Sequence, residues 1–260
     1  MYTHNLDPVL IDFGFLVIRW YSLAYIFGIL IGWWLGKRII LKRFRNLNFN
    51  IKEFDNLITY IIISMLLGGR IGYILFYNFE YYLSNPLDVL KIWEGGMSFH
   101  GALIGIILGT YWFSIKKNIS TFFLLDIIAF VAPIGIFFGR VANFINGELV
   151  GKTTDVFWGV IFPNIDNNIR HPSQLYEAFF EGVVLFIIMN LILFKNNYKT
   201  GTCSYIFLIF YGIFRTFSEL FREPDSQVGY LFHLISMGTV LSSLMILAGI
   251  IIFLKKDDIK

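Results

Sequence analysis

Ionisable side chains interrupt long apolar stretches at several places in this chain of 260 residues. They recur in short polar blocks, which contain Arg70, His100, Arg140, Arg170, His171, Arg215, Glu219, Arg222 and Glu223. A charged group inside a bilayer costs about 2.5–3.5 kcal/mol on insertion scales, so such groups usually serve a function. Arginine keeps its charge and presents a planar fork of N–H donors that matches a phosphate. The pattern therefore predicts a phosphate site. Because the arginines interrupt apolar stretches, a phospholipid head group is the ligand that we expect there.

Several of these groups also have a structural interpretation. Arg215 and Glu219 are spaced i, i+4, which suits an ion pair on one helix face. Glu177 and Glu181 have the same spacing at the start of an apolar stretch, where carboxylates favour a helix N-terminus. Arg70 could bond to helix-end carbonyls instead of a ligand. These alternatives stay open at the level of the sequence.

The sequence motifs of several other kinds of catalytic site are missing from the chain. The motifs HExxH and GxSxG are missing, as is the spacing of metal-binding His and Asp residues, so we expect neither a metal centre nor a serine nucleophile. Cys203 is the single cysteine, which excludes an internal disulfide, and we interpret it as a buried small hydrophobic residue. Asp126 lies apart from the other polar groups, so we interpret it as structural.

The composition indicates a membrane protein. Hydrophobic residues make up 57% of the chain and charged residues only 15%, too few charges to cover a water-soluble protein of this size. The net charge of +3 gives no indication of a nucleic-acid partner. The first residues lack a basic segment, so we expect no cleavable signal peptide.

Seven stretches are long and apolar enough to cross a bilayer as helices. They are Trp20–Gly36, Leu57–Tyr77, Met97–Ile115, Phe122–Phe138, Gln174–Phe194, Thr202–Leu220 and Leu231–Leu254. Polar and apolar residues do not alternate within them, which argues against a β-barrel. We therefore predict an all-α integral membrane protein with about seven transmembrane helices and a single polytopic domain, residues 1–260.

The basic residues predict how these spans are oriented. Thirteen of the 21 Lys and Arg residues fall in loops on one side, which the positive-inside rule makes cytoplasmic. The N-terminus is then outside and the C-terminus inside, and the loops at residues 78–96 and 139–173 form a small extracytoplasmic head. In this topology, five segments bring their polar groups to the outer face of the membrane. The lipid bilayer and a site toward its outer leaflet follow as expectations.

The polar blocks resemble those of one bacterial family. The run GRVANFINGELVG at residues 139–151 resembles the signature of the phosphatidylglycerol–prolipoprotein diacylglyceryl transferases. Further blocks similar to the family, in the same order, lie at residues 19–25, 68–73, 95–101, 170–177 and 214–225. One departure is Ala102, where the family commonly has glycine. The resemblance reaches from the first span to the start of the last.

This resemblance implies an activity, partners and a location. The diacylglyceryl group of phosphatidylglycerol would move to the lipobox cysteine thiol of a prolipoprotein signal peptide, forming a thioether and releasing glycerol phosphate. The reaction would take place at the bacterial plasma (inner) membrane and would need no cofactor or metal.

The resemblance also implies roles for individual residues. Catalytic roles fall on His100, Arg140, Arg215 and Tyr25; head-group binding and support fall on Arg140, Asn143, Asn146, Glu148, Gly151, Arg215 and Glu219. His100 would accept the thiol proton, since an imidazole titrates near pH 6.5 and a thiol near pH 8.5. The two arginines would stabilise the charge that develops on the leaving phosphate. Glu148 and Glu219 would orient the arginines, and Tyr25 would hold the head group or the base.

Two other function classes compete with the transferase. A lipid or solute carrier could use the arginines as an anion site, but transporters often contain internal repeats and midplane sites. No repeat is apparent here, and the polar groups gather at one face. An outer-leaflet phosphatase is disfavoured because an obvious nucleophile or metal set is missing.

Overall fold

The computed structural model describes residues 2–14, 17–44, 49–91, 95–195, 198–224, 230–231 and 235–255. Contacts divide the chain into two compact units, one formed by Met1–Gly36 with Asp126–Lys260 and the other by Lys37–Leu125. Each unit is described by itself. The prediction of a single domain stays a prediction.

The unit Lys37–Leu125 is built on α2 (Ile51–Tyr77) and α4 (Phe99–Lys117), with the short helices α3 (Phe79–Ser84) and η1 (Pro86–Leu90) between them. Glycines bring α2 and α4 into backbone contact, because a Cβ on Gly68 would lie 2.8 Å from the Cα of Gly105. Small residues allow this kind of close approach between apolar helices. The end of α1 and the start of α5 complete this unit.

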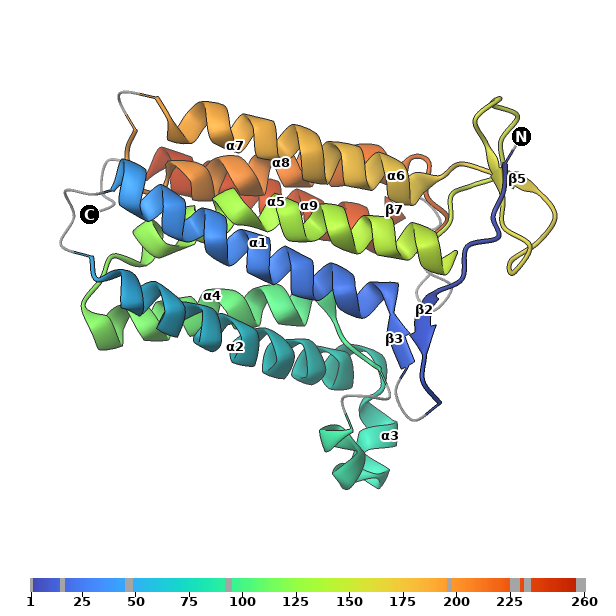
Figure 1. Cartoon of the computed structure of the whole chain (residues 1–260), viewed down its shortest axis with the longest axis horizontal. Coiled ribbons are helices and arrows are strands. Elements are labelled where there is room, and N and C mark those ends of the chain that lie inside the picture. Colours follow the sequence, from blue (N-terminus) through green and yellow to red (C-terminus); the bar gives the residue numbers. More distant parts are fainter. Residues whose placement is uncertain are drawn as a thin grey trace. The chain divides into compact units, whose positions relative to one another are not determined.

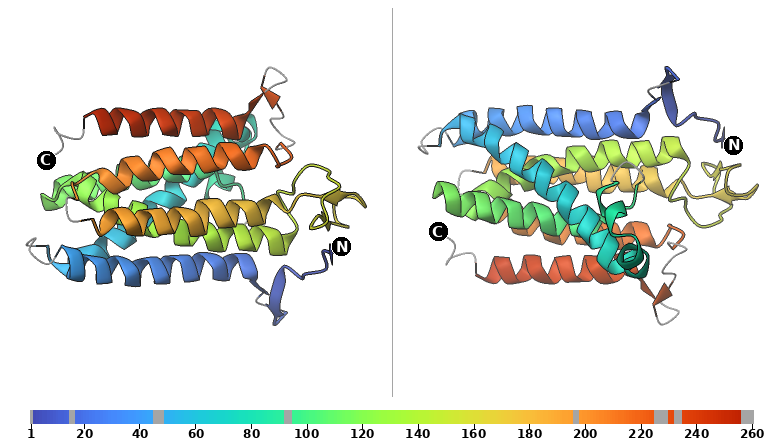
Figure 2. Two further views of the ribbon diagram at one scale, coloured as in Figure 1. Left: turned by 90° about the horizontal axis from the view of Figure 1, so that it is seen from above. Right: turned by 90° about the horizontal axis from the view of Figure 1, so that it is seen from below.

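The other unit contains most of α1 (Trp20–Arg43) and α5 (Thr121–Asn146), then a helix in three parts and two further long helices (Figure 1). The three parts are α6 (Ser173–Glu177), the π-helical η3 (Ala178–Val184) and α7 (Leu185–Leu193). The two further helices are α8 (Thr202–Glu219) and α9 (Met237–Leu254), which pack on each other. Figure 2 shows α5, α7, α8 and α9 running side by side.

A small β-sheet covers one end of this unit. It joins β1 (Tyr2–Thr3), β4 (Val160–Ile161) and β5 (Ile169–Arg170), with β1 parallel to β4 and β5 antiparallel to it. Val150, Val160 and Phe162 form its hydrophobic core, against which Phe144 at the end of α5 packs. The long connection after α5 is therefore folded, and the N-terminal segment is part of it. The other strands among the described residues form two antiparallel pairs, β2 (Val9–Asp12) with β3 (Val17–Arg19) and β6 (Tyr230–Leu231) with β7 (Ile235–Ser236).

The predicted helical membrane character is confirmed. Among the described residues, five helices are long and apolar enough to cross a membrane, and they are α1, α2, α5, the helix Ser173–Leu193 and α9. Helices also occupy the remaining two predicted stretches, as α4 and α8. Seven crossings and their orientation stay predictions, and the short strands were not predicted.

Candidate functional site

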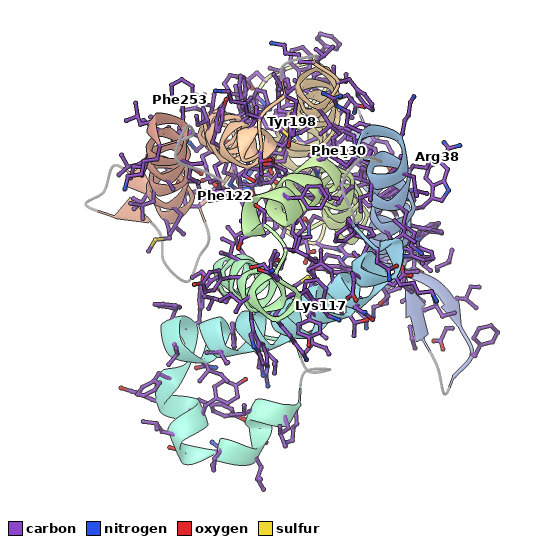
Figure 3. All side chains as sticks on the ribbon, turned by 90° about the vertical axis from the view of Figure 1, so that its left-hand side faces the viewer. Arg38, Lys117, Phe122, Phe130, Tyr198 and Phe253 are labelled. Atoms are coloured by element: carbon purple, nitrogen blue, oxygen red, sulfur yellow. The ribbon has the colours of Figure 1, made fainter. Side chains whose placement is uncertain are left out.

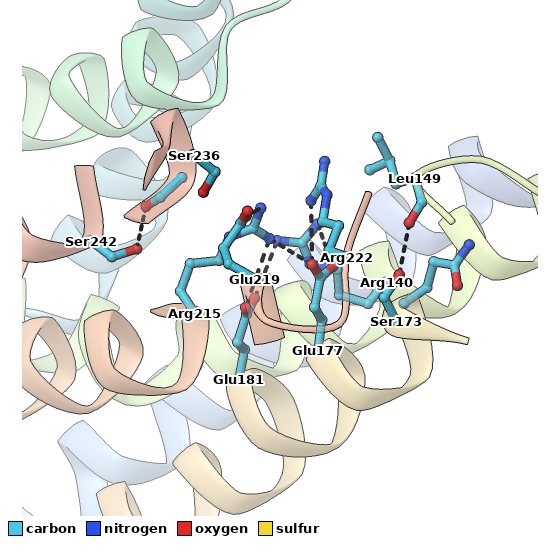
Figure 4. A network of polar contacts seen from close by, with 12 residues as sticks. Arg140, Leu149, Ser173, Glu177, Glu181, Arg215, Glu219, Arg222, Ser236 and Ser242 are labelled. Carbon is cyan, nitrogen blue, oxygen red and sulfur yellow. Dashed lines mark hydrogen bonds and ion pairs between the residues drawn. The ribbon is translucent and has the colours of Figure 1, made fainter. Parts of the chain in front are cut away.

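Three arginines and three glutamates form a connected cluster near the end of α5, where α6 passes into η3, and at the end of α8 (Figure 4). Arg140 comes from α5, Glu177 from α6 and Glu181 from η3, while Arg215 and Glu219 lie on α8 and Arg222 just beyond it. These segments are far apart in sequence, so the packing of the helices assembles the site. Arg140 and Arg215, which the sequence predicts to act together, both belong to this cluster.

Glu177 is the centre of this cluster because three arginines share its carboxylate. Its Oε2 lies 3.0 Å from Nη1 of Arg140. Its Oε1 accepts from Nη1 of Arg215 at 2.8 Å and from Nη1 of Arg222 at 3.3 Å. A glutamate held by three guanidinium groups fixes the positions of all three relative to one another.

The carboxylates of Glu181 and Glu219 each form a hydrogen bond with one arginine. Nη2 of Arg140 donates to Oε2 of Glu181 at 3.2 Å, and Oε1 of Glu181 lies 3.9 Å from Nη1 of Arg215. Nη2 of Arg215 donates to Oε1 of Glu219 on the same helix. This is the i, i+4 ion pair that the spacing predicts, and the role of Glu219 in orienting Arg215 stays a prediction.

Burial differs between Arg140 and Arg215 and the two glutamates that they share. The side chains of Glu177 and Glu181 are 0% exposed, whereas those of Arg140 and Arg215 are 15% and 11% exposed. The carboxylates therefore lie behind the guanidinium groups. A guanidinium has five N–H donors, more than the two carboxylate contacts described for Arg140, so donors remain for an anion.

A second polar group follows Arg140 along α5. Nδ2 of Asn143 donates to Oε1 of Glu148 at 2.7 Å, and Nδ2 of Asn146 donates to the same oxygen at 3.3 Å. The sequence-based role of Glu148 as an orienting partner of the arginines is therefore not what the structure shows: its donors are asparagine amides. Gln174, which is fully buried, donates to the backbone carbonyl of Glu148 at 2.6 Å.

Gly151 acts through its backbone. Its N–H donates to the carbonyl of His171 at 3.0 Å, and a Cβ at this position would lie 2.7 Å from the carbonyl oxygen of Phe221. Glu223 closes the contact by donating its N–H to the carbonyl of Val150 at 3.1 Å. This close approach, which only glycine permits, joins the connection after α5 to the segment that carries Arg222.

The other two predicted catalytic residues are Tyr25 and His100, and the structure describes the side chain of Tyr25 alone. Tyr25 on α1 packs edge-to-face on Tyr21 with ring centroids 5.2 Å apart, and it is close enough to Arg140 and Glu148 to interact electrostatically. His100 is the second residue of α4 and belongs to the unit Lys37–Leu125, and its side chain lies outside the described residues. Its role as the base stays a prediction.

Arg70 has a structural environment rather than a ligand site. It is 5% exposed and donates to five backbone carbonyls of its own unit, those of Asp88, Val89, Lys91, Gly95 and Gly96. These contacts hold the loop between η1 and α4. The alternative that Arg70 bonds to carbonyls is confirmed.

Asp126 and Cys203 also have structural environments, at the opposite end of their unit from the arginines. Asp126 accepts from the backbone N–H groups of Gly201 at 2.6 Å and Ser204 at 2.7 Å, so it satisfies the start of α8. The hydroxyl of Tyr198, labelled in Figure 3, also donates to it. Cys203 is fully buried in the same region, as predicted.

Arg170 and His171 lie in the sheet region outside the arginine cluster. Arg170 donates to both carboxylate oxygens of Asp166, at 3.1 and 2.6 Å, and these bonds hold the pKa of Asp166 well below its usual range. Burial lowers the pKa of His171, whose ring lies 5.1 Å from that of Phe221. Both residues stabilise the fold around the site.

Sequence reasoning missed the central role of Glu177 and Glu181, which it interpreted as residues of a helix N-terminus. A signal was available, because a carboxylate inside an apolar stretch requires a positive partner. Neither residue's partner could be identified from spacing, since the arginines lie on other helices.

Comparison with known proteins gives a consistent result. A family model described as prolipoprotein diacylglyceryl transferase matches residues 8–255. A phosphatidylglycerol–prolipoprotein diacylglyceryl transferase of Rickettsia bellii is 50% identical over 97% of this chain and 96% of its own length. Proteins with the same name from Rickettsia felis and Rickettsia typhi are 50% and 49% identical, over 94% and 96% of this chain and 95% and 96% of their own lengths.

Proposed function

Since the chain belongs to the prolipoprotein diacylglyceryl transferase family, we propose that Arg140 and Arg215 bind the phosphate of phosphatidylglycerol while the enzyme transfers its diacylglyceryl group to a prolipoprotein. This transfer is the first step of lipoprotein maturation. The observation that supports the phosphate role best is the arrangement of charges. Partly exposed guanidinium groups stand in front of fully buried carboxylates.

The charges of the cluster suit a reaction in which an anion gains charge. The three arginines and three glutamates balance one another in formal charge, and an entering phosphate binds the guanidinium donors of Arg140 that the carboxylates leave unused. When the carbon–oxygen bond breaks, the phosphodiester becomes a phosphomonoester with additional negative charge. Arginine donors then bind the leaving group more strongly than the substrate, which lowers the barrier.

The acceptor in this proposal is the lipobox cysteine of the precursor's signal peptide. Its sulfur attacks the glyceryl carbon, a thioether forms, and glycerol phosphate leaves with the electron pair of the broken bond. His100 takes the thiol proton, because the pKa of an imidazole lies near 6.5 and that of a thiol near 8.5. No cofactor takes part.

The surrounding residues bind and support the head group. Asn143 and Asn146 share the carboxylate of Glu148 one turn beyond Arg140, which places polar groups beside the predicted phosphate. Gly151 keeps the connection after α5 in place. Tyr25 contacts the head group in this proposal, since its electrostatic interactions reach Arg140 and Glu148.

We place this site toward the outer leaflet of the plasma (inner) membrane of a bacterium, in a chain that crosses it seven times. The distribution of charge within the unit formed by Met1–Gly36 and Asp126–Lys260 supports this orientation. The arginine cluster lies where α5 and α8 end, whereas Lys195, Lys199 and Lys255 lie at the opposite ends of α7, α8 and α9. Lys256 and Lys260, which also support the prediction, lie outside the described residues. The sheet region is then the extracytoplasmic head.

An assay with purified protein tests the proposal. The enzyme in lipid nanodiscs is mixed with phosphatidylglycerol and a lipobox peptide, and release of glycerol phosphate is measured. We expect release that requires the peptide cysteine and disappears when serine replaces it. Arg140→Ala should abolish release, whereas a near wild-type rate would mean that the phosphate binds elsewhere. Release without peptide would indicate that water, not the peptide thiol, accepts the diacylglyceryl group.

A further inference from the structure

Gly238 lies in the first turn of α9, directly against the carboxylate of Glu219. A Cβ built on Gly238 would lie 2.7 Å from Cδ of Glu219 and 3.2 Å from its Oε2. Distances this short leave no room for a methyl group while the carboxylate keeps its place. The absence of a side chain at Gly238 is therefore what allows Glu219 to reach Arg215 in its present position.

Hydrogen bonds within α9 and its cap hold the backbone around Gly238. Ser236 caps α9 by accepting the N–H of Thr239 at 3.1 Å, and Ser242 donates its hydroxyl to the carbonyl of Gly238 at 2.7 Å (Figure 4). One turn further along, a Cβ on Gly212 of α8 would lie 2.8 Å from the carbonyl oxygen of Ser242. The two helices are therefore already in close backbone contact there.

The side chain of Glu219, by contrast, ends in a flexible carboxylate. A methyl group at Gly238 would be accommodated by moving this carboxylate, at little cost to folding. The displaced carboxylate would then leave Nη2 of Arg215, whose other carboxylate contacts are with Glu177 at 2.8 Å and Glu181 at 3.9 Å. Arg215 would turn toward those partners and away from its present direction.

We propose that Gly238 is a positioning residue of the transferase: it leaves space at the start of α9 for the Glu219 carboxylate and so fixes the direction of Arg215. This inference rests on the proposed role of Arg215 in binding phosphate. The positive end of α9 adds to the effect, because a carboxylate is favoured beside a helix N-terminus. Gly238 itself touches no substrate and acts through Glu219 alone.

The structure offers a matched control on the same helix. A Cβ on Gly249 would lie 2.7 Å from Cγ1 of Ile209 and 2.9 Å from the backbone carbonyl oxygen of Tyr205. A methyl group there also enters the contact between α8 and α9, but it meets backbone and lies away from the arginines. Gly249→Ala therefore measures the effect of disturbed helix packing without a change at the site.

The experiment compares Gly238→Ala with Gly249→Ala in melting temperature and in peptide-dependent release of glycerol phosphate. Gly249→Ala should lower Tm more, yet leave kcat close to the wild-type value. Gly238→Ala should change Tm little and lower kcat by at least about tenfold, with a smaller change in KM, because one charge-assisted contact of Arg215 is lost. Equal activity of the two variants would overturn the inference.

A shortened carboxylate tests the route of the effect. In Glu219→Asp the carboxylate withdraws by one methylene, so adding Gly238→Ala should cost little more. The same loss in both backgrounds would mean that the methyl acts through another contact, and would refute the proposal. Arg215→Ala separates the two proposals. If it is inactive while Gly238→Ala is fully active, only the inference on Gly238 fails; if Arg215→Ala is active, both fail.

Discussion

Replacement of Glu177 by glutamine tests whether one carboxylate orders three arginines. Oε1 of Glu177 accepts from Arg215 at 2.8 Å and from Arg222 at 3.3 Å, while Oε2 lies 3.0 Å from Nη1 of Arg140. Glutamine has the same shape, but one of its ends is an NH₂ donor. Whichever way the amide turns, a donor then faces an arginine donor, so at least one arginine loses its contact.

The size of the effect follows from these contacts. Removing one partner of a buried ion pair costs about 3–5 kcal/mol. The loss is smaller here, because the amide oxygen still accepts from Arg215 and Arg140 keeps its bond to Glu181 at 3.2 Å. We expect a loss of about 2–3 kcal/mol of transition-state stabilisation, which is roughly a 30- to 150-fold decrease in kcat/KM.

The assay is peptide-dependent release of glycerol phosphate from phosphatidylglycerol, with Glu181→Gln measured beside Glu177→Gln. Both residues are fully buried, but Glu181 makes one hydrogen bond to Arg140 and only a 3.9 Å contact with Arg215. Glu181→Gln should therefore cost less activity. A larger loss in Glu181→Gln, or near wild-type kcat/KM in Glu177→Gln, would refute the reasoning that Glu177 is the centre of the cluster.

Three further outcomes are expected. His100→Asn should lower kcat far more than binding of phosphatidylglycerol, and unchanged turnover would remove His100 as the base. Arg170 lowers the pKa of Asp166 in the folded state, so Asp166 should stabilise its loop fully above its unfolded pKa of about 3.9. This stabilisation should be lost as the pH falls from that value toward the lowered folded pKa. Amide exchange protection of Asn168 measures the loss, and Asp166→Asn should remove the pH dependence. Arg70→Lys should increase amide exchange in residues 86–91 and 95–98, because one ammonium cannot reach five carbonyls, and unchanged exchange would contradict the structural role of Arg70.

Residue types and spacing predicted several parts of the site. The apolar stretches give the positions of the helices, and the pair Arg215–Glu219 follows from i, i+4 spacing on one helix. Asp126 and Cys203 are structural, as their isolation from the other polar groups suggested. These predictions depend on local sequence, which is why they succeeded.

Partners on different helices could not be predicted in the same way. Glu177 meets Arg140 because η3 packs closely on α5, where a Cβ on Gly182 would lie 2.7 Å from Cβ of Phe137. The π-helical turn of η3 also changes the direction of the side chains that follow Glu177, and the apolar pattern does not reveal it. The asparagine partners of Glu148 depend on the turn after α5, in which Gly147 has a φ of 64°.

The parallel pairing of Tyr2 with Val160 has a consequence for how the protein is made. A ribosome adds about 5–20 residues per second, so roughly 8–30 seconds separate the synthesis of these two strands. During that time β1 has no partner strand. His4 also lacks its contact until Phe144 is made, because its Nε2 lies 2.8 Å from the carbonyl oxygen of Phe144 in the folded protein. The sheet and the last turn of α5 therefore take their final form only late in translation, after the insertion machinery has received the first helices.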